Sequence, residues 1–337
     1  MPTRTRLWLY FHGFTSRALM LYNLQENGTD AYLSDFDRFI KSPEINADWS
    51  VFLDNKLLFY HLLNEHEDHR VTIYGVLKYG RVYPIDNSAE PSISPGRWIR
   101  QTLDEEGSLV VKPVTGGGGK NVRLCRVTDD GYQINGTVHT ASEFEGLMSD
   151  LDEYLVSEFI EQTDYARELY PATSNTIRVV TMVCPETDDV FIAQAIQRMG
   201  ADGTGPVDNF SDGGLSASID IRTGTLGTAA QYPHPDRTMG IQLDDLEWQN
   251  THPDSGAEIT GVEIPAWDAI REQLLEIADD LSYLPYVGWD IIVTDDEGSF
   301  KLIEANSHPG VKSLQVHGPL LADERVRNFY ETYGVIN

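Results

Sequence analysis

The sequence predicts an α+β protein, and two blocks of secondary-structure patterns carry this prediction. A compact block of short strand patterns with one helix lies between residues 98 and 161, and a larger mixed block follows it. The chain has 337 residues, of which 41% are hydrophobic, so it can bury a sizeable core. A length of this size corresponds to about two domains.

We divide the chain into four predicted segments. They are an N-terminal helical extension, the start of the core with a linker, a lid-like subdomain, and a C-terminal subdomain, at residues 1–53, 54–97, 98–161 and 162–337. In the extension, apolar patterns predict short helices at residues 18–24 and 32–40. Residues 54–66 carry one wide apolar stripe behind an aspartate that can cap a helix, so they predict a further helix.

Strand patterns begin after this helix. Residues 71–85 predict two strands joined by a Gly-containing turn, and the Pro-rich stretch 86–97 predicts a linker. The lid-like subdomain is expected to contain a helix at residues 143–151 and four strands. These strands are predicted at residues 108–114, 121–127, 132–136 and 154–160.

The C-terminal subdomain is expected to contain five strands and one clear helix. The helix is predicted from Trp267 to Leu281, because its apolar residues Ile270, Leu274, Ile277 and Leu281 are spaced by four, three and four positions. The strands are predicted at residues 175–183, 190–198, 214–221, 289–294 and 300–306.

The composition is strongly acidic, with 53 acidic and 25 basic residues and a net charge of −28. Such a chain lacks the broad basic face that attracts nucleic acid or an anionic membrane surface, so no nucleic-acid partner is expected. The acidic residues are dispersed, and only seven of the basic residues are lysines. This composition is typical of salt-loving microbes. It also makes the placement of each lysine more informative.

Targeting segments and cysteine patterns give no positive indication of a location or a function. No apolar run approaches the roughly 18 residues that span a bilayer, and the N-terminus does not match a signal peptide. Cys125 and Cys184 form neither a disulfide framework nor a zinc pattern, and we expect both to be small buried residues. We therefore expect a cytoplasmic protein without membrane insertion.

The stretch LVVKPVTGGGGKNV places four glycines directly after a strand, with Lys112 before them and Lys120 after them. Glycine tolerates conformations that other residues avoid and exposes its N–H groups, so a glycine hairpin can close over a polyphosphate. It is not a Walker loop, because Asn121 stands where Ser or Thr would follow the lysine. The alternative interpretation is a flexible surface hairpin.

Acidic and amide side chains meet on two later strand patterns. Asp290 lies near the end of one strand, and Glu304 and Asn306 lie two residues apart on the next, so both point to the same face. Oxygen ligands in this arrangement suit Mg²⁺ carrying phosphates. The alternative is a buried polar pair whose members satisfy each other.

Two arginines and one hinge strand complete the candidates. Arg178 lies mid-strand in an apolar setting and needs an anion, for which phosphate is a good match; the alternative is a structural ion pair. Arg198 ends the next strand and could face the same cleft. Residues Glu158 to Ile160 could hydrogen-bond adenine through their backbone and offer an apolar wall in Phe159, or they could form an ordinary strand.

Along the chain the motifs follow one another as the lysine strand, the glycine loop, the hinge strand, the arginine strand, Asp290 and the Glu-x-Asn pair. This order resembles that of the ATP-grasp superfamily over roughly residues 54–318. The phrases DNKLLFYHLL, VVKPVTGGGGKNV, SNTIRVVT and VGWDIIVTDDEG followed by LIEANSHPG are most similar to its sugar-transfer-associated group. That group is related to the TupA-like ATP-grasps and to the α-L-glutamate ligases. Residues 1–50 depart from the pattern, because the α/β domain that usually precedes this core is not recognisable.

The resemblance implies two α+β subdomains that clasp ATP, with Mg²⁺ as the metal, two ions rather than one, and Mn²⁺ as an alternative. It assigns Lys112 to the α- and β-phosphates, metal binding to the three oxygen ligands, and the transferred phosphoryl group to Arg178. The loop 208–214 resembles the segment that lies against substrate, which makes Asn209 a catalytic candidate beside Arg198. The implied nucleotide contacts are Lys56, Lys112, Gly116, Gly117, Gly118, Gly119, Lys120, Glu158, Phe159 and Ile160.

The activity implied by the resemblance is that of an ATP-dependent carboxylate–amine ligase. It would form an amide through an acylphosphate, from small-molecule, glycan or peptide substrates, in cell-envelope biosynthesis for example. Two alternatives stay open: a small-molecule kinase that phosphorylates a hydroxyl, and a non-catalytic nucleotide-binding module. The sequence leaves the oligomeric state and both substrates undetermined.

Overall fold

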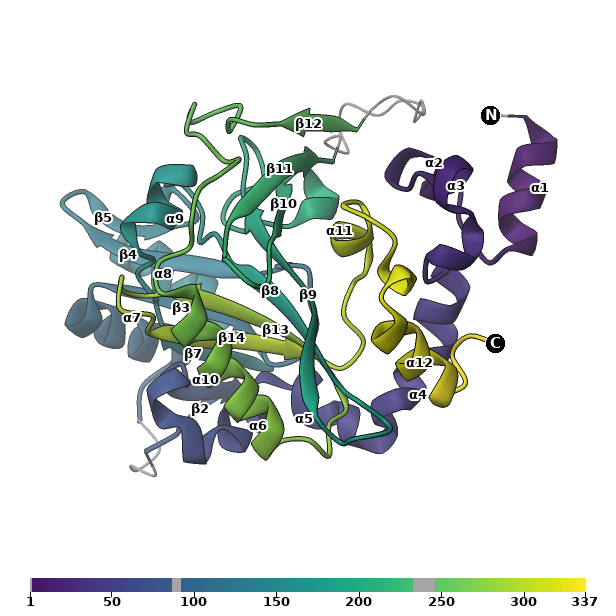
Figure 1. The fold of residues 1–337 in the computed structure, drawn as a ribbon. Helices are drawn as coiled ribbons and strands as arrows, with labels where there is room; N and C mark the ends of the chain where they lie inside the picture. Colours follow the sequence, from purple (N-terminus) through teal and green to yellow (C-terminus); the bar gives the residue numbers. More distant parts are fainter. Residues whose placement is uncertain (1, 87–91, 233–245) are drawn as a thin grey trace. The chain divides into compact units, whose positions relative to one another are not determined.

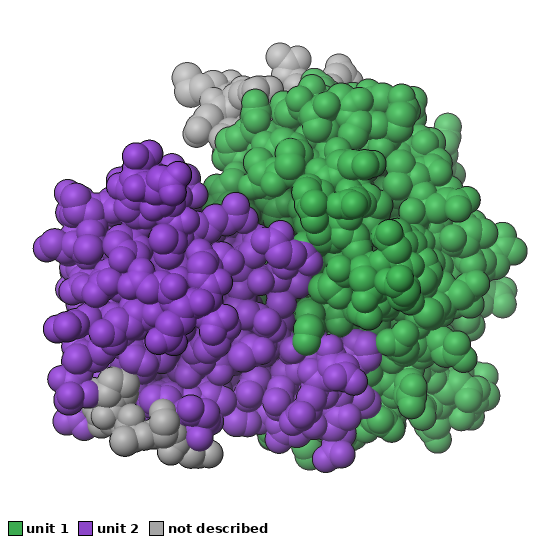
Figure 2. All heavy atoms as spheres, turned by 90° about the vertical axis from the view of Figure 1, so that its left-hand side faces the viewer, with its two compact units in different colours: residues 1–54, 162–337 green, residues 55–161 purple. Residues whose placement is uncertain are grey.

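The computed structural model describes residues 2–86, 92–232 and 246–337, and it contains two compact units (Figures 1 and 2). Unit 1 comprises residues 1–54 and 162–337, and unit 2 comprises residues 55–161. Each unit combines one sheet with helices, which confirms the predicted α+β class. Of the predicted linker, residues 87–91 lie outside the described part. The four-segment division stays a prediction, while the contacts group residues 1–54 with residues 162–337.

Unit 2 is built on an antiparallel sheet of seven strands in the order β2-β1-β7-β3-β4-β5-β6. Alternation along β3 sends Leu109 and Val111 to one face, where both are fully buried. The strands are β1 (Ile73–Lys78), β2 (Arg81–Pro84), β3 (Ser108–Pro113), β4 (Arg123–Thr128), β5 (Gly131–Ile134), β6 (Thr137–His139) and β7 (Tyr154–Glu158).

Two helices, α7 (Pro95–Glu106) and α8 (Ala141–Ser149), contribute Ile99, Leu103 and Phe144 to the core on this face. A capping box between Thr140 and Glu143 begins α8. The sequence analysis did not predict α7 and extended the linker over its first turn. That turn begins with a proline, a residue that is common in linkers but also favoured at the first position of a helix.

The other face of this sheet is covered by α6 (Lys56–Leu62). Its Leu57 and Tyr60 pack against the small cluster around Leu155 of β7. Asn55 caps the helix by accepting hydrogen bonds from the backbone N–H groups of Leu57 and Leu58, at 3.0 and 3.1 Å. The predicted helix at 54–66 is therefore shorter, and a 3₁₀ segment (Asn64–His69) follows it.

Unit 1 is built on a second antiparallel sheet of seven strands, in the order β12-β11-β10-β9-β8-β13-β14. All five predicted strands are present, with ends that differ by up to three residues, and β11 and β12 are additional. The strands are β8 (Ile177–Val183), β9 (Val190–Met199), β10 (Leu215–Ile219), β11 (Leu226–Gln231), β12 (Glu247–Gln249), β13 (Tyr286–Val293) and β14 (Phe300–Asn306).

One face of this sheet is divided into an apolar and a polar part. Tyr286 lies opposite Met182, and these two join a core cluster with residues of α12 (Glu324–Thr332). Further along the same strands, Asp290 lies opposite Arg178. Because directly opposed residues share a face and side chains alternate, all four lie on one face.

The predicted helix is present as α10 (Trp267–Asp280), with Ile270, Leu274 and Ile277 buried.

The N-terminal segment consists of short helices that belong to unit 1. They are α1 (Thr3–Phe11), α2 (Ala18–Leu21), α3 (Leu24–Asn27), a 3₁₀ turn (Thr29–Ala31), a π-helical turn (Asp37–Lys41), α4 (Pro43–Asn46), a second 3₁₀ turn (Ala47–Ser50) and α5 (Val51–Asp54). The predicted helices at 18–24 and 32–40 correspond to shorter helical turns, and α1 was not predicted. Two further short helices, α9 (Asp164–Leu169) and α11 (Lys312–Gln315), lie elsewhere in unit 1.

Two smaller predictions were also checked. Cys125 is buried as expected, whereas Cys184 is half-buried, because β8 ends at Val183 and leaves Cys184 in the following turn. Among the helices of the described residues, none combines the length and the apolar character that a bilayer crossing requires.

Candidate active site

A row of charged side chains crosses three adjacent strands of unit 1. Arg178 on β8 lies opposite Asp290 on β13, and Asp290 lies opposite Glu304 on β14. The backbone pairing places the three side chains next to one another on the polar part of the sheet face. The structure thus brings together residues that are 112 positions apart in the chain.

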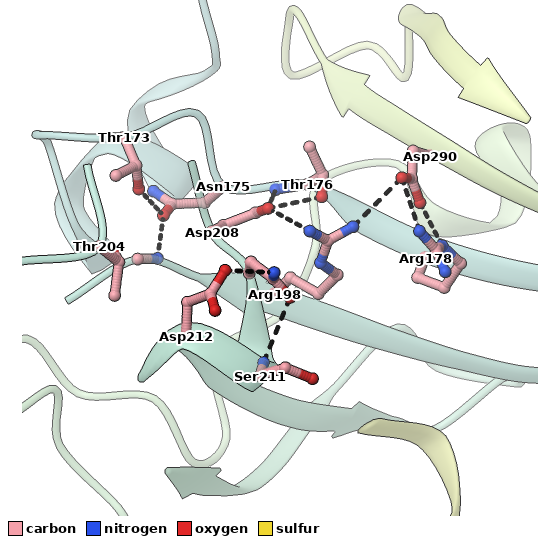
Figure 3. A network of polar contacts seen from close by, with 12 residues as sticks. Thr173, Asn175, Thr176, Arg178, Arg198, Thr204, Asp208, Ser211, Asp212 and Asp290 are labelled. Atoms are coloured by element: carbon pink, nitrogen blue, oxygen red, sulfur yellow. Dashed lines mark hydrogen bonds and ion pairs between the residues drawn. The ribbon is translucent and has the colours of Figure 1, made fainter. Parts of the chain in front are cut away.

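Asp290 is the centre of this row and is only 1% exposed. Its carboxylate accepts hydrogen bonds from Nε and Nη2 of Arg178, the second at 2.7 Å, and from Nη1 of Arg198 at 3.1 Å (Figure 3). Burial alone would raise the pKa of Asp290, but the charges of the two arginines outweigh it and lower the pKa to about 2. Asp290 is therefore an anion at neutral pH. This bidentate contact has the geometry of the structural ion pair that the sequence left open as an alternative for Arg178, and the role of Arg178 toward phosphate stays a prediction.

A second carboxylate, Asp208, continues the network beyond Arg198. It accepts hydrogen bonds from Nη2 of Arg198 at 2.5 Å and from the N–H and hydroxyl of Thr176 at 2.8 and 2.6 Å (Figure 3). The sequence analysis missed Asp208, although it begins the loop 208–214 that was singled out. Its neighbour Asn209 instead donates a hydrogen bond to Asp212 at 2.6 Å.

The position of Glu304 depends on a bulge in β14. Asp290 pairs with Glu304 while the next residue, Ile291, pairs with Leu302, so β14 has one extra residue at this point. Glu304 and Asn306 are both half-buried, and Ala305 between them is only 5% exposed. Asn306 also donates a weak hydrogen bond, at 3.5 Å, to the carbonyl of its cross-strand partner, Gly288.

Residues of the N-terminal segment support the chain directly after Asn306. Buried Asn46 donates hydrogen bonds to the carbonyls of Tyr286 and Ser307, at 2.6 and 2.8 Å. Asp54 accepts hydrogen bonds from the N–H and the hydroxyl of Ser307, at 3.0 and 2.7 Å. Arg38 donates to the carbonyl of His308 at 3.3 Å. The N-terminal segment is therefore part of the framework of this site.

The fold family implies Mg²⁺, and the residues present fit it in part. Glu304 and Asn306 offer hard oxygen ligands on one face, as Mg²⁺ prefers. The polar cluster holds three carboxyl groups and two guanidinium groups, and two of the carboxylates, Asp290 and Asp208, are paired with the guanidinium groups. Asp290 fits less well, because both of its oxygens already accept hydrogen bonds from arginines. In the described part of the chain, no group of three or more His, Cys, Asp or Glu is placed to hold a metal.

The nucleotide candidates of unit 2 gather around the glycine-rich loop. The N–H of Lys56 donates to the carbonyl of Val114 at 2.9 Å, and its ammonium group donates to the carbonyl of Gly116 at 2.7 Å. Lys112 lies opposite Leu155, on the face that α6 covers. The structure thus brings Lys56, Lys112 and the start of the glycine loop into one region of unit 2.

The loop itself requires glycine at several positions. Gly116, Gly118 and Gly119 have φ values of +101°, +71° and +68°, which side chains rarely tolerate. Gly117 does not have a positive φ, and a Cβ added there would meet no heavy atom within 4 Å. Lys120 after the loop is exposed.

The three adenine candidates follow one another at the end of β7. Glu158 is the last residue of the strand, and its carboxylate accepts a hydrogen bond from the N–H of Thr72 at 2.7 Å. Phe159 is half-buried beneath the guanidinium of Arg126, 4.8 Å from the ring centre, and Ile160 is buried. Whether these residues form an apolar wall that binds adenine stays a prediction.

Comparisons with known proteins give one clear result. Residues 37–329 match the family model described as sugar-transfer associated ATP-grasp. No curated protein matches the sequence.

Several solved structures show a distant similarity. A purK N5-carboxyaminoimidazole ribonucleotide synthetase in complex with ADP has 11% identity and a TM-score of 0.40, over 77% of this chain and 46% of that chain. The ATP-grasp ligase PsnB with a minimal precursor has 14% identity and a TM-score of 0.40, over 84% and 64%. An L-amino acid ligase from Bacillus licheniformis has 11% identity and a TM-score of 0.37, over 78% and 42%. The chain spans less than two thirds of each of these three structures.

Proposed function

The chain belongs to the sugar-transfer associated ATP-grasp family, and from this premise we propose that it is an ATP-dependent ligase that joins a carboxylate to an amine. The observation that carries the proposal is the charged row Arg178–Asp290–Glu304, with Arg198 and Asp208 fastened to it. Phosphoryl transfer requires positioned cations and a metal rather than covalent help from the protein. In this proposal the arginines of the network would supply the cations, and Glu304 would supply an oxygen ligand for the metal.

Each unit would contribute one part of the machinery. In unit 2, Lys112 and the N–H groups of the glycine loop would bind the phosphates, and Lys56 would hold the loop through its contact with Gly116. In unit 1, Glu304 and Asn306 would hold Mg²⁺, which when bound neutralises phosphate charge. The family resemblance assigns these two parts to the same nucleotide.

Asp290 would act on the reaction through the arginines. Its carboxylate fixes Nε and Nη2 of Arg178 and Nη1 of Arg198. Arg178 would then present its Nη1 to the transferred phosphoryl group in a fixed orientation, which avoids reorganisation during the reaction. We propose Asp290 as the residue that positions both arginines, in place of the metal ligand that the sequence pattern alone indicated.

The chemistry follows in two steps. A carboxylate oxygen attacks the γ-phosphorus of ATP, the bond from that phosphorus to the bridging oxygen breaks, and ADP leaves with the electron pair. The substrate is now an acylphosphate. An amine nitrogen then attacks the acyl carbon, inorganic phosphate leaves with the electron pair of the carbon–oxygen bond, and the nitrogen loses a proton. A closed, dry site protects the acylphosphate from water.

The proposal is tested by phosphorus NMR of the protein with Mg-ATP and a small-metabolite extract of its source organism, in high salt. We expect ADP and inorganic phosphate to rise together only when the extract is present. A new phosphoester signal without inorganic phosphate would instead identify a kinase. Bound but unconsumed ATP would identify a nucleotide-binding module, and either result would overturn the ligase proposal.

The Glu304→Gln variant tests the metal site within the same assay. Replacing the carboxylate by a neutral amide is expected to lower turnover by more than about 100-fold, because a catalytic metal stabilises the transition state by several kcal/mol. Glu272→Gln is the matched control, since Glu272 is an exposed glutamate on α10 and none of the strands of the charged row carries it. Equal turnover in the two variants would remove Glu304 from the site.

A further inference from the structure

Helix α1 presents its apolar side chains to solvent. Of its nine residues only Leu9 is buried. The exposed fractions are 51% for Leu7, 42% for Trp8, 76% for Tyr10 and 79% for Phe11. In Figure 1 the helix lies at the edge of unit 1. A surface helix ordinarily turns its apolar side to the core, so this arrangement is reversed.

Helical geometry gathers these side chains on one side. Leu7 and Phe11 are four residues apart, as are Arg4 and Trp8, so each pair is adjacent on the helix surface. At about 100° per residue, Leu7, Phe11 and Arg4 lie on the side opposite Leu9, the buried residue of the helix, and Trp8 lies on the flank of that side, about 100° from Leu9. The solvent side of α1 is thus an apolar strip of Leu7, Trp8 and Phe11 with an arginine at its N-terminal end.

The charge of this region differs from that of the rest of the chain. Residues 1–25 contain Arg4, Arg6 and Arg17 and no acidic residue, so all 53 acidic residues of the sequence lie at position 26 or beyond. The chain as a whole is acidic, with a net charge of −28. The apolar strip therefore lies in a stretch of sequence that contains basic residues and no acidic residue.

The attachment of the helix leaves this strip accessible. The chain turns back after Phe11 at Gly13, which has a φ of +77°, and the carbonyl of Gly13 accepts a hydrogen bond from the N–H of Phe36 at 2.9 Å. Phe36 begins a second exposed apolar group with Phe39 and Ile40, which are 52%, 51% and 60% exposed. The N-terminal segment thus carries a large share of the exposed apolar side chains of the described residues.

We propose that α1 docks on an anionic lipid surface, lying in the headgroup region with Leu7, Trp8 and Phe11 buried among the acyl chains. Aromatic residues are favoured at this depth, and arginines attract anionic headgroups. A second copy of the chain fits this face less well. A two-fold interface must be self-complementary, and α1, which has two arginines and no acidic residue, offers no ion partner to the same helix of a second copy.

The proposal is independent of the ligase activity, so it is tested without nucleotide. The protein is sedimented with vesicles of phosphatidylcholine alone or with 30% phosphatidylglycerol, in 0.1 M and 1 M salt, and circular dichroism verifies the fold in each buffer. We expect it to pellet with the anionic vesicles. The Trp8→Ser/Phe11→Ser variant should lose this binding in both buffers, whereas Leu147→Ser/Trp248→Ser, which removes two exposed apolar residues elsewhere, should keep it.

A second variant changes only exposed charges and cannot fail through loss of packing. Arg4→Gln/Arg6→Gln should weaken binding about 30-fold in 0.1 M salt, because each arginine near the surface contributes about 1 kcal/mol. In 1 M salt the loss of binding should be smaller, because salt screens these charges. Wild-type protein that pellets with neither vesicle would overturn the proposal. So would self-association that the Trp8→Ser/Phe11→Ser variant abolishes in the absence of vesicle binding, since the strip would then be an interface between copies.

Discussion

The sequence pattern around Asp290 is compatible with two roles, a metal ligand and the partner of a buried arginine. An aspartate before a Glu-x-Asn pair indicates a metal site, yet its carboxylate lies between Arg178 and Arg198. The pairing could not be predicted, because it depends on which strands are neighbours and on their register. A shift of one residue between β8 and β13 would turn Arg178 to the other face.

The Asp290→Asn substitution separates a buried ion pair from a metal ligand. The variant leaves two arginines without their shared anion in a buried site, so we expect a loss of about 3–5 kcal/mol in the free energy of unfolding. Asp268→Asn is the control, because Asp268 pairs with Arg271 at 2.9 Å while 80% exposed, and this pair contributes at most about 1 kcal/mol.

Chemical denaturation in high salt measures both variants. If Asp290→Asn unfolds as easily as Asp268→Asn but loses turnover, Asp290 acts in catalysis and the ion pair contributes little to stability. This result would favour the metal-ligand interpretation that the sequence pattern alone indicated.

At the scale of elements, strands were predicted better than the segments between them. β8 and β13 are apolar and nearly fully buried, and β9 and β14 have no exposed residue, so their patterns are strong. The helix α7 was missed because a proline begins it and polar residues fill much of it. The helix α1 was missed because its apolar residues face solvent and give no core-facing stripe.

The glycine loop offers a comparison between two neighbouring positions. A Cβ at Gly116 or at Gly117 would meet no heavy atom within 4 Å, and only Gly116 has a positive φ, of +101°. Gly116→Ala should therefore strain the loop by about 1–2 kcal/mol and weaken Mg-ATP binding about 5- to 30-fold. Gly117→Ala should bind almost as the wild type does. Calorimetric titration with Mg-ATP measures both, and equal affinities would show that the loop shape does not determine binding.

The contact between α11 and β10 makes the stability depend on pH. His317 follows α11, and its ring lies 3.0 Å from the hydroxyl of Ser216 on β10. Burial lowers the pKa of His317 to about 4, against about 6.5 in an unfolded chain. Between these pH values the unfolded chain binds the proton and the folded protein does not. Stability is therefore complete above pH 6.5 and decreases as the pH falls toward 4, by at most about 3 kcal/mol.

Denaturation curves at pH 7, 6, 5 and 4.5 test this dependence. We expect His317→Gln to reduce the slope of unfolding free energy against pH in this range. His61→Gln, at an exposed histidine of α6, should retain the wild-type slope. An unchanged slope in His317→Gln would assign the acid sensitivity to other groups.

For the whole molecule, the dominant property is the net charge of −28. Self-repulsion of this size opposes the compact state, and salt screens it, with a Debye length of about 10 Å at 0.1 M and 3 Å at 1 M. We expect the melting temperature to rise steadily from 0.1 to 1 M sodium chloride. Scanning calorimetry measures it, and a flat response would argue against adaptation to high salt.

The family was predicted correctly from the motifs, whereas the role of the N-terminal segment was not. The resemblance began at about residue 54, and residues 1–50 matched nothing familiar. The hydrogen bonds from Asn46 and Asp54 to residues around Ser307 join parts of the chain that are more than 250 positions apart. Contacts of this kind leave no local pattern in a sequence, so only the fold reveals them.

The interruption of unit 1 by unit 2 has a consequence for biosynthesis. Unit 2 is complete once residue 161 has been translated, but the first 54 residues must wait for β14, which ends at Asn306, before Asn46 and Asp54 find their partners. At about 5–20 residues per second, the intervening 145 residues take roughly 7–30 s. During this interval the nascent chain contains all residues of unit 2, while Asn46 and Asp54 still lack their partner Ser307.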